Sequence, residues 1–557
     1  MMNNKKDCIR IVLIGLIISF LAFIPMITEK GISVRGDGTY HLARIESIAD
    51  AMREGIFPVK LHFSSEFGFG YGSGFFYPNF LLYFPAFLML FGVTLNSAYK
   101  IFLLVVLNIM FFSTYLSLNL VVRKREVSVI AAALMILSTP VFFSVYSMFS
   151  LGNYTAMIFM PPAICGIWGV MQCEKNKFLN LKYSISFGVG FLGLILTHTL
   201  SLLFSFIVCL LIMFFYIKNI FTFKEIFFRI FFIVLTVLAL SAAYWIPMLE
   251  QFSVQKYKVS LPYIDPSKNY SDLLEIIMEE RYGIFLAIFT ISVCIVVFKM
   301  KFKKKYNKNK KLILFASILS SLCILTLLFT CWKWFWEKFG SVFLFIQVPA
   351  RLWNISFVCI IIAFCIVFSL IEINYKKKFM MGMILILMSY LFSLYYLPDD
   401  LNDKRVLYTD TKITDIDHGD GSGGLEWLPL KNGRNFNEPN KAVANDGSGA
   451  DGIKEKTNTE YKVWLLTEKE WYDIPYVYYK GYHAYLENGV ELASDVNHKT
   501  GLFRVYMPKD SEDEIITVVV KYIPTVLQKI SYIISIGYAV FLAVFIIREI
   551  RKCKQGE

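Results

Sequence analysis

Stretches of about 20 consecutive apolar residues recur along the whole chain, separated mostly by short loops rich in lysine and arginine. That length is what an α-helix needs to cross the hydrocarbon core of a bilayer. With 56% hydrophobic and 17% aromatic residues, the 557-residue chain is too apolar for a soluble protein. We therefore expect an all-α polytopic membrane bundle of about twelve spans, at residues 9–27, 98–121, 127–145, 154–171, 183–198, 200–217, 226–247, 283–299, 311–331, 352–373, 378–397 and 525–548.

The formal net charge of +13 comes largely from the basic loops between these spans. Loops of this kind stay on the cytoplasmic side, so the charge indicates membrane orientation and contact with membrane lipids, not nucleic acid. We expect a multi-pass protein of the cell membrane with both termini in the cytoplasm. The exterior segments are then residues 28–97, 248–282, 332–351 and 398–524.

Two regions leave the span count open. The apolar segment 80–92 is short and bounded by proline and glycine, so we expect a re-entrant or interfacial helix there. Residues 183–218 can be divided into helices in more than one way. Counting 80–92 as a span would reverse the orientation of everything after it, unless a second segment were also miscounted.

The polar stretch near the C-terminus alternates in the manner of β-strands at residues 461–466, 474–479, 502–506 and 515–520. The sequence therefore predicts a small exterior β-rich domain. We expect three parts: a membrane domain at 1–397 with the exterior loop 28–97, the β-rich domain at 398–524, and a last helix with a basic tail at 525–557. The ten cysteines show neither a disulfide framework nor a metal-binding spacing.

The first exterior loop places an acid, an imidazole and a guanidinium together. Apolar residues from 40 to 52 follow helical spacing, which predicts a helix lying flat on the membrane with Asp37, His41 and Arg44 on another face. Asp37 is either a general base or only an N-cap. His41 binds an anion, moves a proton or serves as a local hydrogen-bonding partner. Arg44 binds phosphate or reaches lipid headgroups.

Glycines and aromatic residues alternate from 66 to 78, in a pattern that resembles neither a Rossmann nor a P-loop fingerprint. Such a loop suits stacking on sugar faces or covering a lipid-linked substrate, or else it anchors the chain at the interface. Its candidate binding residues are Glu66, Tyr71 and Tyr77.

Three further ionisable residues stand at the exterior ends of predicted spans, where burial is costly without a functional or pairing reason. They are His198, Glu250 and Arg351. We expect Arg351 to hold a lipid phosphate or pyrophosphate, and Glu250 to pair with Arg351 or with a sugar hydroxyl. The alternative is a structural ion pair.

Nine short motifs spread over nearly the whole chain occur together in one family. They lie at residues 36–45, 55–59, 70–72, 76–86, 151–154, 197–198, 243–250, 347–351 and 424–429. In this respect the chain resembles bacterial membrane proteins labelled "6-pyruvoyl-tetrahydropterin synthase-related". Proteins of that kind look like the GT-C class of polytopic glycosyltransferases, which take a sugar from a polyprenyl-phosphate carrier at the exterior membrane face.

The resemblance implies that Asp37 is the general base on the acceptor, because GT-C enzymes place an acid in their first exterior loop. Many members pair two acids there, and the nearest candidate in this chain is Glu66. The resemblance also brings Glu426, from the motif at 424–429, into the predicted site. It implies a polyprenyl-phosphate-linked sugar as donor and an envelope polymer or lipid as acceptor. No cofactor is indicated with certainty, and a divalent cation stays open.

Two other functions remain open. A transporter or flippase of a lipid-linked or polar substrate would line its path with the same charged groups, although the chain shows no internal repeat. A non-catalytic membrane protein of envelope assembly would keep its function after both Asp37 and Arg351 are neutralised.

Overall fold

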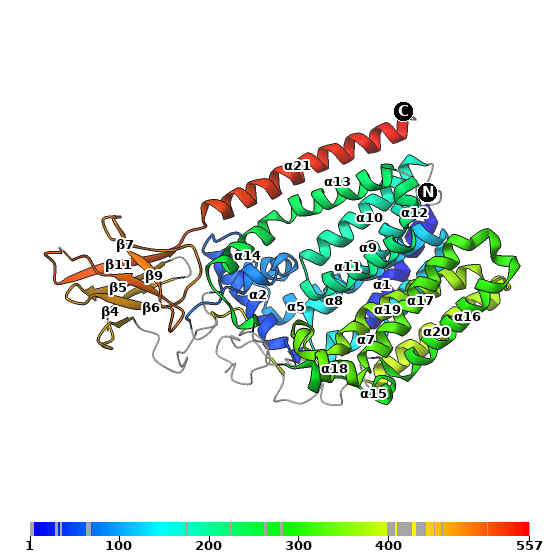
Figure 1. Ribbon diagram of the computed structural model, residues 1–557, viewed down its shortest axis with the longest axis horizontal. Helices are drawn as coiled ribbons and strands as arrows, with labels where there is room; N and C mark the ends of the chain where they lie inside the picture. Colours follow the sequence, from blue (N-terminus) through cyan, green and yellow to red (C-terminus); the bar gives the residue numbers. More distant parts are fainter. Residues whose placement is uncertain are drawn as a thin grey trace.

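The computed structural model describes residues 5–27, 32–33, 36–62, 68–172, 176–222, 224–260, 264–278, 282–397, 407–408, 426–429, 442–450, 452–457, 460–509 and 511–555. Its helices form an elongated bundle with the β-sheets beyond one end, while both chain termini lie at the other end (Figure 1).

Among the described residues, nine helical segments are long and apolar enough to cross a membrane. They are α1 (Lys5–Ile27), α5 (Leu95–Val122), α8 (Leu151–Ala156) continued by α9 (Met160–Gln172), α10 (Lys177–Ile195), α16 (Gly283–Phe302), η5 (Lys304–Asn309) continued by α17 (Lys310–Thr330), η8 (Pro349–Leu352) continued by α19 (Trp353–Leu370), α20 (Tyr375–Tyr395) and α21 (Val526–Gln555). These segments identify a multi-pass membrane protein.

Two more spans are bent pairs of helices. The first joins α6 (Arg125–Ile136) to α7 (Thr139–Phe142) and the π-helical turn η2 (Phe143–Ser147) at 42°. The second joins α13 (Lys224–Leu240) to α14 (Ala242–Val254) at 69°. A shorter apolar helix, α11 (Thr199–Phe215), follows α10 after a break that contains His198. The predicted helical bundle is thus confirmed.

The spans predicted at 127–145 and 226–247 correspond to these two bent pairs. The first breaks at Leu137 and Ser138, and Pro140, which has no N–H to donate, lies in the first turn of the helix that follows. The second breaks at Ser241, whose hydroxyl donates to the carbonyl of Val237 at 2.7 Å.

The remaining helices are short and connect the spans. They are α2 (Gly38–Arg53), α3 (Ser73–Phe76), η1 (Phe80–Leu82), α4 (Tyr83–Leu90), α12 (Ile217–Thr222), η3 (Lys258–Ser260), η4 (Pro266–Lys268), α15 (Leu273–Met278), α18 (Lys333–Phe339), η6 (Gly340–Val342) and η7 (Leu344–Ile346). Helices η1 and α4 occupy the short apolar segment 80–92, and its place relative to the membrane stays a prediction.

Helix α2 differs from the expected surface helix. Most of its residues are buried, including the polar His41, Arg44, Glu46 and Ser47. It packs on α4 and α5 within the protein, so its polar face meets other side chains instead of water. The first turn of α2 is therefore part of an enclosed site.

The β-strands form two larger sheets and one short pair. The four-stranded sheet has the order β3-β6-β10-β9 and the five-stranded sheet the order β4-β5-β11-β7-β8, while β1 pairs with β2. Their bounds are β1 (Ile32–Ser33), β2 (Leu407–Tyr408), β3 (Val443–Ala444), β4 (Gly452–Lys456), β5 (Glu460–Leu466), β6 (Trp471–Val477), β7 (Tyr482–Leu486), β8 (Glu491–Leu492), β9 (Ser494–Val496), β10 (Leu502–Tyr506) and β11 (Ile515–Tyr522). Each of the four predicted strand segments overlaps a strand, although β6 ends at Val477 and the prediction extended to 479.

The β-rich part is joined to the helical part through the segment between β6 and β7. Gln251 of α14 donates to the carbonyl of Lys480 at 3.0 Å and accepts from its N–H at 2.9 Å. The N–H of Val477 donates to the carbonyl of Phe69 at 2.8 Å. The aromatic loop around Phe69 is thereby fixed between the sheets and the bundle.

Candidate functional site

The site begins at the N-terminus of α2, where Asp37 follows a glycine. The N–H of Asp37 donates to the carbonyl of Met148 at 3.1 Å. Gly36 has φ +54°, and a side chain there would overlap with the same carbonyl, so only glycine fits. The Asp37 carboxylate makes no capping hydrogen bond. The capping alternative therefore does not describe its side chain.

The carbonyl that holds Asp37 comes from an unusual stretch of backbone. The N–H of Met148 donates to the carbonyl of Phe143 at 2.9 Å, five residues earlier, which is a π-helical bond. Phe149 then takes a left-handed conformation with φ +49° and lies against Gly38. Turns of this kind gather at functional sites, because the surrounding structure must hold them in place.

Burial raises the pKa of Asp37 to about 6, while the charge of Arg351 lowers it and that of Glu426 raises it further. A carboxyl with such a pKa is largely ionised at neutral pH, and it takes up a proton more readily than an ordinary aspartate. This environment suits a general base.

Arg351 reaches the site from the turn that precedes α19. Gln347 has φ +60° and ψ −62°, and the N–H of Val348 donates to the carbonyl of Ile346 at 2.7 Å, which together form a strained γ-turn. Pro349 then starts η8, which carries Arg351. The strained turn is consistent with a side chain that must be held at one place.

Arg44 is buried and hydrogen-bonded within the protein. Its Nη2 donates to the carbonyls of Tyr77 at 3.1 Å and Pro78 at 3.0 Å, and to Oδ1 of Asn79 at 2.6 Å. Its guanidinium also lies 4.5 Å from the centre of the Tyr77 ring. These contacts give Arg44 a positioning role for residues 77–79, in place of the expected contact with phosphate.

Two histidines flank Tyr77. The rings of His41 and His198 lie 5.8 and 6.1 Å from the Tyr77 ring. Burial lowers the pKa of both, so both imidazoles are neutral at physiological pH. His198 also accepts a hydrogen bond from the N–H of Ser201 at 3.3 Å and so caps α11. Neutral imidazoles are suited to hydrogen-bonding sugar hydroxyls.

Gly152 gives Tyr77 and His198 the space they occupy. A side chain at this position would overlap with the Tyr77 hydroxyl and approach Cδ2 of His198 to 2.8 Å. The sequence motif at 151–154 marks the segment but gives no role to its glycine. Tyr40 and Asn79, which contact Arg44, are also absent from the residues expected from sequence.

Tyr71 and Glu426 enter the site through one contact. The N–H of Trp427 donates to the Tyr71 hydroxyl at 3.1 Å, and the Trp427 ring stacks on Phe76 at 5.0 Å. The carbonyl of Glu426 accepts from the N–H of Val259 at 2.7 Å. Residues 426–429 are thus attached beside Asp37, whose pKa the Glu426 carboxylate raises.

Two of the expected residues are not in this cluster. The Glu250 carboxylate accepts from Thr525 Oγ1 at 2.9 Å and Gln528 Nε2 at 3.0 Å, and lies 3.6 Å from Lys480 Nζ. The expected pairing of Glu250 with Arg351 is therefore wrong, because the carboxylate joins α14 to α21 and the β-rich part. Glu66 lies outside the described residues.

The aromatic loop is less open than expected. Phe69, Phe75 and Phe76 are almost fully buried and belong to the core shared with the β-strands. Gly72 leaves room for the ring of Tyr479, so the glycines allow close packing. Of the expected loop residues, Tyr77 reaches the two histidines and Tyr71 supports Trp427.

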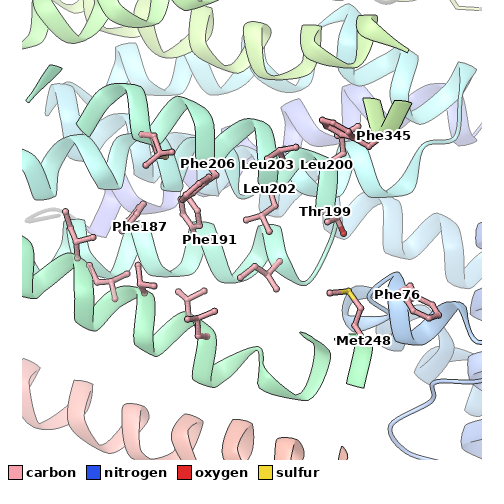
Figure 2. A pocket seen from close by; sticks show the side chains of 18 of the residues that line it. Phe76, Phe187, Phe191, Thr199, Leu200, Leu202, Leu203, Phe206, Met248 and Phe345 are labelled. Atoms are coloured by element: carbon pink, nitrogen blue, oxygen red, sulfur yellow. The ribbon is translucent and has the colours of Figure 1, made fainter. Parts of the chain in front are cut away.

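An apolar groove of about 770 Å³ runs between α10, α11 and α13 (Figure 2). One end contains Phe187, and the other is lined by Phe76 and Thr199, together with Trp427, whose ring stacks on Phe76. In the sequence Phe76 precedes Tyr77, Thr199 follows His198, and Trp427 follows Glu426. The groove therefore ends beside the Asp37 site.

Asp37 and Glu426 supply two carboxylates to this region. Within the part of the chain that the structure describes, no group of three or more His, Cys, Asp or Glu residues could hold a metal ion. The divalent cation stays a prediction.

These features define a multi-pass membrane protein with a half-buried carboxylate beside an apolar groove. Residues 8–371 match the model of a family of unknown function, DUF6541. Because the match covers more than half of the chain, the chain belongs to this family. The pterin-related family name expected from the motifs is not confirmed. No curated protein matches the chain.

Two solved structures show similarity to this chain. The mycobacterial arabinofuranosyltransferase AftD matches with 13% identity and a TM-score of 0.45, over 71% of this chain and 27% of that one. The Archaeoglobus fulgidus oligosaccharyltransferase matches with 13% identity and a TM-score of 0.36, over 73% of this chain and 58% of that one. This chain thus spans about a quarter of the mycobacterial protein.

Proposed function

We propose that this chain is a membrane glycosyltransferase that moves a sugar from a polyprenyl-phosphate carrier to an acceptor hydroxyl at the outer face of the cell membrane. The acceptor is an envelope polymer or lipid. The observation that carries the proposal is the Asp37 carboxyl, with a pKa of about 6, beside Arg351 and at the end of an apolar groove. The motifs shared with GT-C-like proteins agree with it.

In the proposed reaction the acceptor oxygen attacks the anomeric carbon of the sugar. A new carbon–oxygen bond forms as the bond from that carbon to the phosphate oxygen breaks, with inversion at the carbon. The electron pair of the broken bond leaves with the lipid phosphate, and Asp37 takes the acceptor proton. The positive charge of Arg351 stabilises the phosphate as its charge grows.

The residues around Tyr77 supply the sugar pocket of this proposal. Tyr77, His41 and His198 offer a ring face and neutral hydrogen-bonding groups. Arg44 and Tyr71 act indirectly. Arg44 holds residues 77–79 in place, and Tyr71 holds Trp427. The pocket is thereby organised before a substrate binds, which lowers the entropic cost of orienting it.

The groove is assigned to the prenyl chain of the donor. Its lining is almost entirely apolar, and along α11 it extends from Thr199 to Met213, about 20 Å at 1.5 Å per residue. A polyprenyl chain in this groove would bring its phosphate to the end where His198 and Arg351 lie. In this proposal the opposite end of the bundle, where both termini lie, faces the cytoplasm, and the basic loops agree with that orientation.

The experiment compares envelope polymers and lipids, by mass spectrometry, from a strain that lacks the gene and carries a plasmid copy. We expect the loss of one defined sugar in the deletion strain and its return with the wild-type gene. The D37N variant should not restore the sugar. The matched control is D50N, on the same helix, where Asp50 pairs with the exposed Arg53. Restoration by D37N at normal membrane levels would overturn the proposal.

A second function is favoured by the two bent helix pairs, because broken helices are common in transporters. A flippase would move a fluorescent polyprenyl phosphate across proteoliposomes without forming a covalent product. Transport that survives D37N, with no sugar transfer, would favour this function over the first.

A further inference from the structure

The bend between α13 and α14 shapes the apolar groove. The two helices form one pair, bent by 69°. Val237 and Leu238 line the groove from the end of α13, and Met248 and Phe252 line it from α14. Figure 2 shows Met248 at the same end of the groove as Phe76. The angle of the bend therefore decides how these two parts of the groove wall stand relative to each other.

A serine of α21 is inserted into the helical hydrogen-bond ladder at this bend. In a straight helix the N–H of Ala243 would donate to the carbonyl of Ala239, four residues earlier. Here the Ser535 hydroxyl accepts from the N–H of Ala243 at 2.9 Å and donates to the carbonyl of Ala239 at 3.2 Å. A side chain inserted in this way is a known cause of a sharp kink. Ser535 thus replaces one helical hydrogen bond with two of its own.

Two further carbonyls at the bend also have side-chain partners. Pro247 has no N–H, so the carbonyl of Ala243 lacks its helical donor, and Nζ of Lys60 donates to it at 3.1 Å. Nε1 of Trp245 donates to the carbonyl of Leu238 at 2.9 Å. A carbonyl without a donor is costly inside a bilayer, so these side chains stabilise the bent form.

The bend is connected to the candidate site through the first turn of α14. The Tyr244 hydroxyl donates to the carbonyl of Phe76 at 2.5 Å. Phe76 lines the groove and precedes Tyr77, whose ring the two histidines flank. Helix α21 packs on both α13 and α14 and runs alongside α13 (Figure 1), while the described residues that line the groove come from other elements. Helix α21 therefore contacts the bend without lining the groove.

We infer that Ser535 is a positioning residue for the lipid carrier, because its hydroxyl holds α13 and α14 at the angle that fits the groove to a prenyl chain. This inference rests on the proposed function, which assigns the groove to that chain. Without the hydroxyl, the N–H of Ala243 and the carbonyl of Ala239 can pair with each other, so the bend opens towards a straight helix and Met248 moves relative to α13. Loss of Ser535 should weaken carrier binding and leave the proton transfer at Asp37 unchanged.

The test measures binding of undecaprenyl phosphate to the full-length protein in detergent, by native mass spectrometry at increasing lipid concentration. We expect S535A to bind the lipid about fivefold more weakly than the wild-type protein, the effect of about one lost hydrogen bond. S535T keeps the hydroxyl and should bind as the wild-type protein does. The matched control is S531A, because the buried Ser531 hydroxyl donates to the carbonyl of Gln528 within α21 itself. Its affinity should equal that of the wild-type protein.

A second variant, K60M, removes the donor to the Ala243 carbonyl from outside α21, and it should also weaken binding. It keeps the test decisive if thermal unfolding shows that S535A does not fold. Hydrogen exchange of the amides of residues 238–248 reports on the bend itself and should be faster in S535A than in S535T or S531A. In a sugar-transfer assay S535A should raise KM for the lipid donor and change kcat by less than about twofold.

Unchanged binding in S535A, or in K60M where S535A does not fold, would overturn the inference. An equal loss in S531A would overturn it too, because any buried hydroxyl of α21 would then have the same effect. A wild-type protein that binds no undecaprenyl phosphate would overturn the assignment of the groove and the inference with it. Weaker binding in S535A, together with no sugar lost from the deletion strain, would overturn the proposed reaction and support the role of Ser535.

Discussion

Arg351 and Asp37 come from distant parts of the chain, and the charge of the arginine holds down the pKa of a carboxyl that burial has raised to about 6. Arg351 follows a strained turn and Asp37 follows a glycine in the left-handed region, so each position depends on local backbone geometry. Two charges held in this way set the protonation state of the site.

The pH dependence of sugar transfer follows from this pair. In the proposed reaction the ionised form of Asp37 is the base, so we expect the rate to rise with pH through about 6 and then to level off. Removing the arginine charge in R351Q should move the rising limb to higher pH. Removing the glutamate charge in E426Q should move it to lower pH. Rates normalised to each plateau measure these shifts, and identical limbs would contradict the assignment of the base.

The free energy of unfolding should depend on the ionisation of Asp37 in the opposite direction: it should fall as the pH rises. The folded-state pKa lies above the ordinary value of 3.8, so the carboxyl stabilises the fold when protonated, and this contribution is lost as the pH rises through about 6. D37N should therefore be more stable than the wild-type protein near pH 8, by up to roughly 3 kcal/mol, and equal to it near pH 4. Thermal unfolding at both pH values measures this. The control D50N should show no such gain.

The contact between Gly36 and Met148 should be sensitive to a single methyl group. G36A should lose stability and sugar transfer, because its Cβ overlaps with the Met148 carbonyl and displaces the Asp37 N–H. Gly55 provides the control, since it also has a positive φ but no atom within 4 Å of its Cβ position. G55A should show only the conformational cost of about 1 kcal/mol. Equal losses in the two variants would show that the contact adds nothing.

The helical bundle and the strands were predictable because their signals are periodic and local. Apolar runs marked the spans, and alternation marked β5, β6, β10 and β11. The break at Ser241 was not predictable, because a hydroxyl bond to Val237 does not alter the apolar pattern. Pro140 was a local signal for the other break, because it has no N–H to continue a helix.

The sequence predicted which residues form the candidate site better than it predicted what each of them does there. Charge at span ends singled out His198 and Arg351, and the structure brings Arg351 close to Asp37 and His198 close to Arg351. The role of Arg44 depends on carbonyls more than thirty positions away, at Tyr77 and Pro78, which no local pattern shows. The burial of the polar face of α2 was also not predictable, because it too depends on residues that are distant in the sequence.

Arg44 should not be replaceable by lysine. A lysine has one ammonium group in place of the planar fork that reaches Tyr77, Pro78 and Asn79, so carbonyls are left without donors in a buried place. We expect R44K to lose about 2–4 kcal/mol of unfolding free energy and most of the sugar transfer. The control R53K changes an exposed arginine of the same helix and should cost less than about 0.5 kcal/mol. Chemical denaturation in detergent measures both.

Glu250 should be needed for stability and not for the reaction. Its carboxylate accepts hydrogen bonds from Thr525 and Gln528 and faces Lys480. In E250Q the side-chain NH2 group, a donor, would replace one accepting oxygen and would face another donor. We expect E250Q to lose about 2–3 kcal/mol of unfolding free energy and to expose the β-rich part to limited proteolysis. The folded fraction should transfer sugar at the wild-type rate.

The control for Glu250 is E337Q, which changes the exposed pair of Glu337 with Lys333 and should leave unfolding unchanged. If E250Q kept its stability and protease resistance but lost sugar transfer, Glu250 would bind substrate, as its position at a span end first indicated. Loss of stability and loss of sugar transfer can be distinguished because the two sites use different elements. The Glu250 contacts join α14, α21 and Lys480, whereas the residues of the Asp37 site come from α2, η8 and the loop at 426–429.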